Sequence, residues 1–179
     1  MIDAGFELRT ERLRLRPYRL EDLDAFHAIV GDPETMRYYP EPFSVEAARD
    51  WIERVRSRYE ELGFGLLMVE DATTGEVIGS CGPNVQTVDG VQEVELGWHV
   101  RRDRWGEGIA PEAAVACRDW SFANLDADHL IALVRPINVP SCRVAEKIGM
   151  TVWKETLFNE RLRWPHHVYR IDRPVDRPA

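Results

Sequence analysis

Residues 105–110 read Trp-Gly-Glu-Gly-Ile-Ala and lie between the end of one predicted strand and the start of a predicted helix. The two glycines of this segment let the backbone approach a ligand closely. The first turn of the helix that follows has backbone N–H groups without intrahelical partners. The helix dipole is positive at the same place, so the segment is suited to bind an anion such as a diphosphate. Arg101, Arg102 and Arg104 lie just upstream and are expected to add Coulomb attraction. An ordinary glycine loop that enters a helix is the alternative, and Pro111 at the third glycine position argues against a dinucleotide motif.

The elements on either side of this loop predict a crossover. Upstream, residues 91–100 (VQEVELGWHV) alternate, with Val94, Leu96 and Trp98 on one face and Glu93, Glu95, Gly97 and His99 on the other. Downstream, residues 129–134 (HLIALV) form a continuous apolar run, which is typical of a strand covered on both faces. A helix at about 109–123 separates the two strands, so they can lie parallel.

The rest of the chain completes an α+β pattern. We expect strands at 13–16, 65–71 and 76–85, helices at 20–30, 44–62 and 139–148, and a closing hairpin of residues 151–158 and 162–171 across Asn159 and Glu160. This order predicts a mostly antiparallel, twisted sheet of about seven strands with four helices. We expect one domain over residues 1–179, with an ordered core at about 6–173.

Composition limits the class of protein. The 23 Lys and Arg residues against 31 Asp and Glu give a net charge of −8, which argues against binding to nucleic acid or to an anionic membrane surface. No apolar stretch is long enough for a transmembrane helix, and the charged N-terminal segment does not resemble a secretory signal. Cys81, Cys117 and Cys142 form no CxxC pair, so we expect reduced thiols and a cytoplasmic location.

A second motif, residues 138–150 (NVPSCRVAEKIGM), fits a short helix with Pro140 in its first turn and Gly149 after its end. Helix formation alone does not require both Asn138 and Ser141 near the end of the apolar strand. Together with WGEGIAPEA at 105–113 and TERLRLRPYRLEDLDAF at 10–26, this motif resembles the GNAT N-acetyltransferase superfamily. The resemblance runs from about residue 8 to 171 and is strongest to the ribosomal-protein N-terminal acetyltransferase branch.

The resemblance implies the acyl-CoA N-acyltransferase (GNAT) fold and acetyl-CoA as co-substrate, without a metal. In this fold the central strands, here 91–100 and 129–134, splay apart to admit the pantetheine arm. The superfamily pattern Arg/Gln-x-x-Gly-x-Gly/Ala cradles the pyrophosphate of acetyl-CoA, and Trp105 replaces its first fixed residue. The implied cofactor-binding residues are Trp98, His99, Val100, Trp105, Gly106, Glu107, Gly108, Ile109, Ala110, Asn138 and Ser141.

Acetyl transfer to an amine needs a neutral amine, a stabilised oxyanion and a proton for the departing thiolate. By the resemblance, the Ser141 hydroxyl supplies the last of these and a backbone N–H near His99 or Val100 supplies the second; the alternative is that Ser141 only caps its helix. We expect Glu95 to act as base, through water, with Glu93 and His99 on the same face as competitors. A solvated carboxylate at the strand edge is the alternative for Glu95.

The acceptor is less constrained by the sequence. At pH 7 an α-amine with a pKa near 7.8 is roughly a tenth neutral, whereas a lysine near 10.4 is neutral in about 1 part in 2,500. A weakly placed base therefore favours an N-terminal α-amine, with direct attack on the thioester. An aminoglycoside or polyamine acceptor, a non-catalytic acetyl-CoA sensor and a purely structural domain stay open, as does a homodimer.

Other notable residues favour structural roles. His166 and His167 are adjacent on a strand and therefore point to opposite faces, which argues against a shared metal. Trp164 could form a wall of the acceptor pocket. For Tyr169 we favour packing in the core over a place in that pocket.

Overall fold

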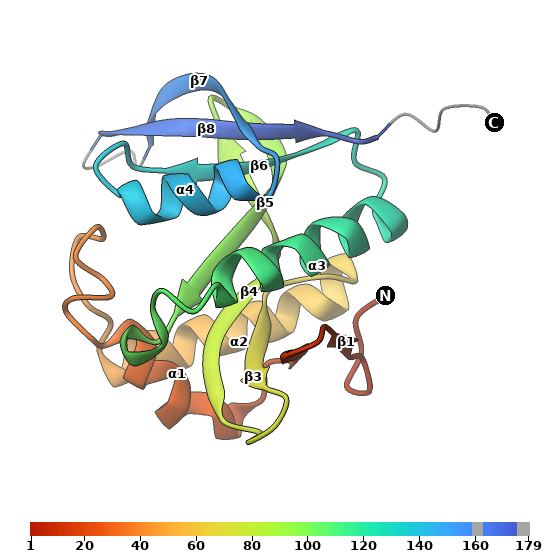
Figure 1. The fold of residues 1–179 in the computed structure, drawn as a ribbon, viewed down its shortest axis with the longest axis vertical. Coiled ribbons are helices and arrows are strands. Elements are labelled where there is room, and N and C mark those ends of the chain that lie inside the picture. The colour runs from red at the N-terminus through yellow and green to blue at the C-terminus, as the bar shows by residue number, and fades with distance from the viewer. Residues whose placement is uncertain (159–162, 175–179) are drawn as a thin grey trace.

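The computed structural model describes residues 1–158 and 163–174 (Figure 1). Its strands are β1 (Leu8–Arg9), β2 (Leu13–Pro17), β3 (Leu67–Asp71), β4 (Val77–Val88), β5 (Val91–Val100), β6 (His129–Val134), β7 (Thr151–Phe158) and β8 (Trp164–Asp172). The helices are α1 (Leu23–Val30), α2 (Val45–Leu62), α3 (Ile109–Asn124) and α4 (Val139–Lys147), with short 3₁₀ turns at Leu20–Asp22 and Arg102–Arg104. All eight strands belong to one sheet in the order β1-β2-β3-β4-β5-β6-β8-β7.

The predicted α+β class and mostly antiparallel sheet with four helices are confirmed, with differences at the boundaries. The sheet has eight strands rather than about seven, because the two-residue β1, too short to show an alternation, pairs with β2. Strand β4 continues to Val88 because its residues 79–88 pair with the whole of β5. Asp89 and Gly90 then form the turn, with φ of 50° and 84°. The predicted turn at Asn159 and Glu160 lies outside the described residues.

Helices cover both faces of the central strands. On β4, the Ser80 hydroxyl accepts from the Tyr18 hydroxyl at 2.5 Å, and the Tyr18 ring packs edge-on against Phe26 of α1. The next residue, Cys81, contacts Cys117 of α3. Because neighbouring side chains on a strand point to opposite faces, α1 lies on one side of the sheet and α3 on the other.

The sheet opens where its two halves meet. Strands β5 and β6 are the parallel pair, and Glu95 opposite Ile131 is the one bridge between them in the described residues. Beyond this bridge the two strands diverge (Figure 1). The edge of β5 that faces β6 therefore has no strand partner over residues 97–100, so free backbone groups there can bind another molecule. This is the predicted splay.

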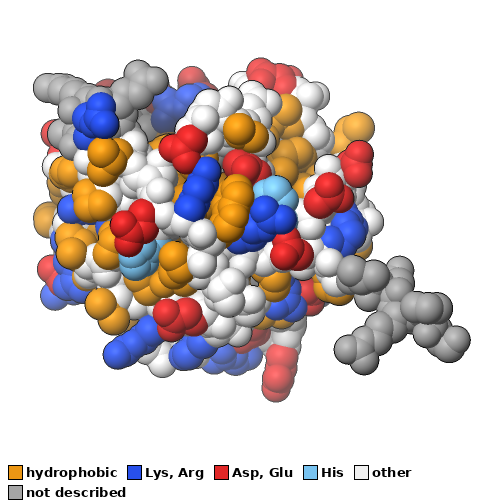
Figure 2. Space-filling model, turned by 90° about the horizontal axis from the view of Figure 1, so that it is seen from above, with side chains coloured by type: hydrophobic (Ala, Val, Ile, Leu, Met, Phe, Trp, Pro, Cys, Tyr) orange, Lys and Arg blue, Asp and Glu red, His pale blue; other side chains and the backbone are white. Residues whose placement is uncertain are grey.

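The second half of the sheet is anchored to the first by the β4–β5 turn. Asp89 accepts from Lys154 at 2.7 Å and from Thr156 at 2.6 Å, both on β7. Seen from above, this end of the molecule carries acidic and basic side chains interspersed with hydrophobic ones (Figure 2). In the described part of the chain, no helix combines the length and apolar character that crossing a membrane requires.

Candidate active site

A cavity of about 680 Å³ opens at the split between β5 and β6. Its walls come from β5, β6, the loop before α3, the first turns of α3 and α4, the segment 35–40 and the start of β8. Of the residues predicted to bind cofactor or to act in catalysis, those that line it are Glu95, Trp98, His99, Val100, Trp105, Gly106, Gly108, Ile109, Ala110, Asn138 and Ser141. The exception is Glu107.

The loop before α3 has the geometry of an anion cradle. Gly106 and Gly108 have φ of 81° and 79°, in the left-handed region that favours glycine. None of the backbone N–H groups of residues 106–110 has an acceptor among the described residues. These free donors stand at the positive end of the α3 dipole, so they fit a diphosphate.

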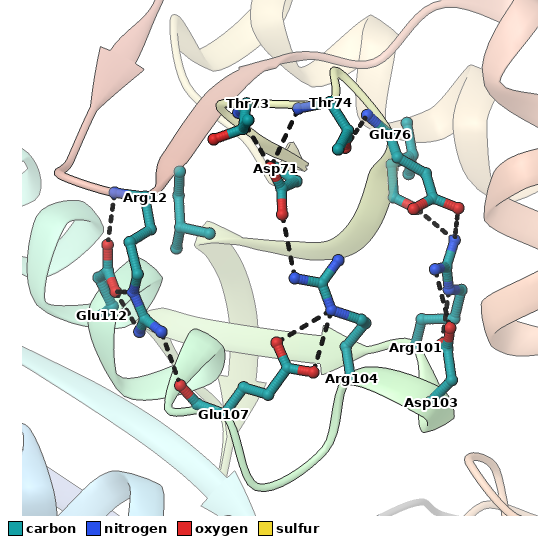
Figure 3. Close-up of polar contacts among 12 residues, drawn as sticks. Arg12, Asp71, Thr73, Thr74, Glu76, Arg101, Asp103, Arg104, Glu107 and Glu112 are labelled. Atoms are coloured by element: carbon teal, nitrogen blue, oxygen red, sulfur yellow. Dashed lines mark hydrogen bonds and ion pairs between the residues drawn. The ribbon is translucent and has the colours of Figure 1, made fainter.

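A polar network holds this loop in place (Figure 3). Arg12 donates to the Glu107 carbonyl oxygen at 2.9 Å and to Glu112 of α3 at 2.8 Å. Arg104 donates to the Glu107 carboxylate at 3.0 Å and to Asp71 of β3 at 3.0 Å. The Glu107 side chain is therefore used to brace the loop, and the backbone N–H of Glu107 is the group it offers to a ligand.

The arginines before the loop do not play the role we expected. The charge of Arg104 is neutralised as described above, and Arg101 is held by Glu76 at 2.7 Å and by Asp103 at 2.6 Å (Figure 3). Arg102 lies 3.9 Å from Asp32. Paired guanidinium groups add little attraction for a phosphate, because their partners cancel most of their field.

Trp105 joins the loop to the end of β5. Its indole Nε1 donates to the Val100 carbonyl oxygen at 2.8 Å. Trp105, which replaces the arginine or glutamine of the superfamily pattern, thus fixes the distance between the cradle and the strand edge. The Val100 carbonyl is occupied by this bond. Neighbouring residues of a strand direct their main-chain groups to opposite edges, and those of His99 face Ser80 of β4, so the main-chain groups of Trp98 and the Val100 N–H are the ones open toward β6.

Ser141 is held by a side chain from the opposite wall of the split. Asn138 caps α4, because its Oδ1 accepts from the Ser141 backbone N–H at 3.3 Å. The Ser141 hydroxyl accepts from the Trp98 indole Nε1 at 2.9 Å. The alternative in which Ser141 caps its helix is therefore wrong. Since Oγ accepts from Trp98, its own proton is free to be donated.

Glu95 has the surroundings of a base that works near neutral pH. It lies opposite Asn84 in the β4–β5 ladder, and its Oε1 accepts from the Leu133 backbone N–H across the split at 3.3 Å. Burial, only partly offset by these hydrogen bonds, raises the pKa of Glu95 to about 7. The alternative of a solvated edge carboxylate is wrong, because the side chain lines the cavity and is desolvated.

The two competitors for the role of base are less suited to it. Glu93 does not line the cavity, and its carboxylate lies 2.8 Å from His129 Nε2. His99 lines the cavity, but burial lowers its pKa to about 4 and its Nε2 lies 2.9 Å from the Tyr39 hydroxyl. A ring with that pKa is neutral at pH 7 but accepts a proton far less readily than Glu95 does.

Part of the cavity wall consists of residues that no sequence pattern predicts. Tyr38 and Tyr39, in the segment between α1 and α2, line the end that also receives Trp164 and His166 of β8 and Arg135 after β6. These positions meet only in the folded chain, and the segment 35–40 has no periodicity. Trp164 lines the cavity, which is consistent with the position in the pocket wall suggested from the sequence.

The other residues noted in the sequence do not form a second site. Tyr169 is 2% exposed and its hydroxyl lies 3.5 Å from Glu146, which is consistent with the packing role we favoured. His167 contacts Glu155 at 3.5 Å, whereas His166 lines the cavity, so the two rings are separated as expected for neighbours on a strand. No cluster of three metal-ligating side chains occurs in the described ranges.

Comparison with known proteins shows which family the sequence matches. Residues 12–151 match the family model described as acetyltransferase (GNAT) domain. The Bacillus subtilis protein YkkB is 37% identical over 152 residues, which cover 83% of this chain and 87% of YkkB. Protein p20 of Bacillus licheniformis, described as an uncharacterized N-acetyltransferase, is 34% identical over 155 residues, covering 86% of this chain and 85% of p20.

Solved structures share the fold. An acetyltransferase from Agrobacterium tumefaciens superposes with a TM-score of 0.78 at 32% identity, covering 96% of each chain. RimL, described as a ribosomal L7/L12 α-N-protein acetyltransferase in complex with coenzyme A, superposes with a TM-score of 0.75 at 15% identity, covering 93% of this chain and 98% of RimL. At that identity the likeness to RimL concerns the fold alone.

Proposed function

Because the chain belongs to the GNAT acetyltransferase family and is an acetyl-CoA-dependent N-acetyltransferase, we propose that it acetylates the α-amino group of a peptide or protein by direct attack. The observation that carries the choice of acceptor is the carboxylate of Glu95 in the cavity, with its pKa raised to about 7. Such a group is half ionised at neutral pH and is matched to an amine with a pKa near 7.8. It is a poor match for a lysine side chain.

The cavity residues have distinct parts in this proposal. The free N–H groups of residues 106–110 hold the diphosphate of acetyl-CoA, and the open edge of β5 near Trp98 to Val100 pairs with the pantetheine arm. Bound acetyl-CoA supplies an activated acyl group. Asn138, whose Oδ1 caps α4, has its amide nitrogen available toward the same arm.

Proton transfer is assigned to two side chains. Glu95 accepts the proton that the amine loses, directly or through one water, as the nitrogen bonds to the carbonyl carbon. A backbone N–H near His99 or Val100 stabilises the negative charge on the carbonyl oxygen. As the carbon–sulfur bond breaks, the Ser141 hydroxyl, oriented by Trp98, donates its proton to the thiolate. Ser141 then regains a proton from solvent, and Glu95 releases the one taken from the amine.

A screen of acceptors tests this proposal. Release of CoA thiol is measured with acetyl-CoA and a set of primary amines: peptides with free N-termini, the same peptides with acetylated N-termini and a free lysine, an aminoglycoside, and spermidine. We expect turnover with the free N-termini and at least about a hundredfold less with the lysine-only peptides, because far less of the lysine is neutral. Turnover confined to the aminoglycoside or spermidine would overturn the α-amine acceptor.

The pH dependence of the reaction tests Glu95 as base. For wild type we expect log kcat/KM to rise with a slope of about two below pH 7 and of about one from there to the pKa of the amine, since both base and amine must lose a proton. In Glu95→Gln the slope should be about one at every pH below the pKa of the amine, and kcat should fall by about a hundredfold. The measurement is kcat/KM for one peptide between pH 5.5 and 9.

Glu93→Gln is the matched control, because Glu93 is two residues away on the same strand but points its carboxylate at His129 outside the cavity. It should keep the wild-type profile. A Glu95→Gln enzyme that still showed the break near pH 7 would remove Glu95 from the role of base.

A further inference from the structure

Arg135 is a cation in the cavity that has no acidic partner among the residues that the structure describes. It follows β6, and its side chain is half-buried between the segment 35–40 and β8. Its Nη1 donates to the Tyr38 carbonyl oxygen at 3.1 Å, and its guanidinium lies 3.9 Å from the centroid of the Trp164 ring. Its Nε is buried and has no hydrogen-bond partner. In the described ranges no carboxylate forms an ion pair with this group.

The other basic residues of the cavity are satisfied or open to water. Arg37 pairs with Glu34 and also contacts the Tyr38 hydroxyl at 2.8 Å. Arg104 is braced between Asp71 and Glu107. Arg143 and Lys147 are exposed on α4. Among the described residues, Arg135 is thus the half-buried cation of the cavity that has no carboxylate partner, and a bound anion would neutralise its charge.

Arg135 lines the same cavity as the group proposed as base. Glu95 accepts from the Leu133 backbone N–H, and Arg135 follows Leu133 by two residues. Among the described residues that line the cavity, Glu95 is the one acidic side chain. An acceptor whose amine faces Glu95 therefore has a positive group in the same cavity.

We propose that Arg135 binds a carboxylate of the acceptor, so that the substrate is an α-amine that also carries a carboxylate near the reacting nitrogen. The inference rests on the proposed function. A carboxylate fits better than a neutral polar group because a guanidinium offers parallel N–H donors that match its two oxygens. The Trp164 ring holds the guanidinium plane in position for this contact. A polycationic acceptor such as an aminoglycoside would instead be repelled.

Two sources of carboxylate give the same chemistry, and matched probes separate them. One pair is Asp-Phe-amide and Asn-Phe-amide, in which the carboxylate belongs to the side chain of an N-terminal residue. The other pair is phenylalanine and phenylalaninamide, in which it is the carboxylate of a free amino acid. The quantity measured is the ratio of kcat/KM for the acid to that for the amide in each pair, by thiol release from acetyl-CoA.

In wild type we expect one of the two pairs to favour the acid, and in Arg135→Met that preference should fall by about tenfold or more, as expected for a lost charge-assisted hydrogen bond. Differences in amine pKa between the two members of a pair cancel when the acid-to-amide ratio of the variant is compared with that of wild type, because both enzymes are assayed with the same probes. Arg135→Lys keeps the positive charge but loses the parallel N–H donors of the guanidinium, so it should retain part of the preference for the acid. Arg37→Gln, which changes the charge of another arginine on the cavity wall, is the control and should keep the wild-type ratio.

An equal ratio in wild type and Arg135→Met for both pairs would overturn the inference while leaving acetylation of α-amines intact. If none of the four probes is acetylated, the proposed function fails in its acceptor. The inference is then decided by calorimetry of Asp-Phe-amide and phenylalanine with the CoA-loaded protein. Binding that Arg135→Met abolishes supports a carboxylate site at Arg135, and absence of binding to wild type overturns it.

Discussion

Gly108→Asp is expected to weaken CoA binding by more than about a hundredfold. The residue is the N-cap of α3, lines the cavity and lies among the free N–H donors of residues 106–110. A carboxylate about 5 Å from a phosphate costs roughly 3 kcal/mol at an effective dielectric constant of about 20. That free energy corresponds to more than about a hundredfold in affinity, measured by calorimetry with CoA.

Gly108→Asn separates the effect of the added charge from the effect of replacing glycine at this backbone conformation. Both replacements must adopt φ near 79°, which asparagine and aspartate tolerate better than other side chains. A Cβ at this position would lie 3.5 Å from Arg12 Nη2, which is an ordinary van der Waals contact, so the Cβ of either side chain fits without a clash. We expect Asn to lower CoA affinity by less than about tenfold, because it has no charge to repel the diphosphate. Equal affinities for Asp, Asn and wild type would show that the diphosphate lies elsewhere.

The parts of the site that the sequence predicts are those made by local geometry. Gly106 and Gly108 adopt the left-handed backbone that a tight approach to a ligand requires, and Asn138 caps the helix that presents Ser141. Each of these features is decided by residues within one turn of each other. The alternation in residues 91–100 likewise placed Glu95 and His99 on one face, and both line the cavity.

The parts that the sequence did not predict depend on partners far apart in the chain. Arg104 was expected to attract a phosphate, but it meets Asp71, 33 residues away, which no local pattern connects to it. The Trp98 bond to Ser141 spans 43 residues, and the Arg135 bond to Tyr38 spans 97. Such contacts are set by how the strands diverge and the helices pack, so a single sequence does not specify them.

The split sheet explains why the chemistry gathers where it does. A parallel pair that separates after one bridge leaves backbone donors and acceptors unpaired on β5, and it opens the sheet interior to a ligand. The same opening takes Glu95 away from bulk water, and this desolvation outweighs the hydrogen bonds and the charge of Arg58, so the pKa of Glu95 is raised. One feature of topology thus provides both the groove for the pantetheine arm and the base for the amine.

Ser141→Ala is expected to lower kcat by about a hundredfold while CoA affinity stays within about threefold of wild type. The hydroxyl is assigned to protonate the thiolate, an interaction that is made only as the carbon–sulfur bond breaks. Loss of such an interaction lowers kcat and kcat/KM equally and leaves ground-state binding in place. Thiol release under saturating acetyl-CoA and calorimetry with CoA measure the two quantities separately.

Trp98→Phe is the informative companion, because it removes the indole N–H that orients the Ser141 hydroxyl but keeps the hydroxyl and most of the ring. A positioning role predicts a smaller loss of kcat, about threefold to tenfold, and no further loss when Trp98→Phe is combined with Ser141→Ala. If the two losses multiply instead, Trp98 acts on the reaction independently of Ser141. A Ser141→Ala enzyme with wild-type kcat would remove the hydroxyl from the mechanism and leave the thiolate to depart without a proton donor from this chain.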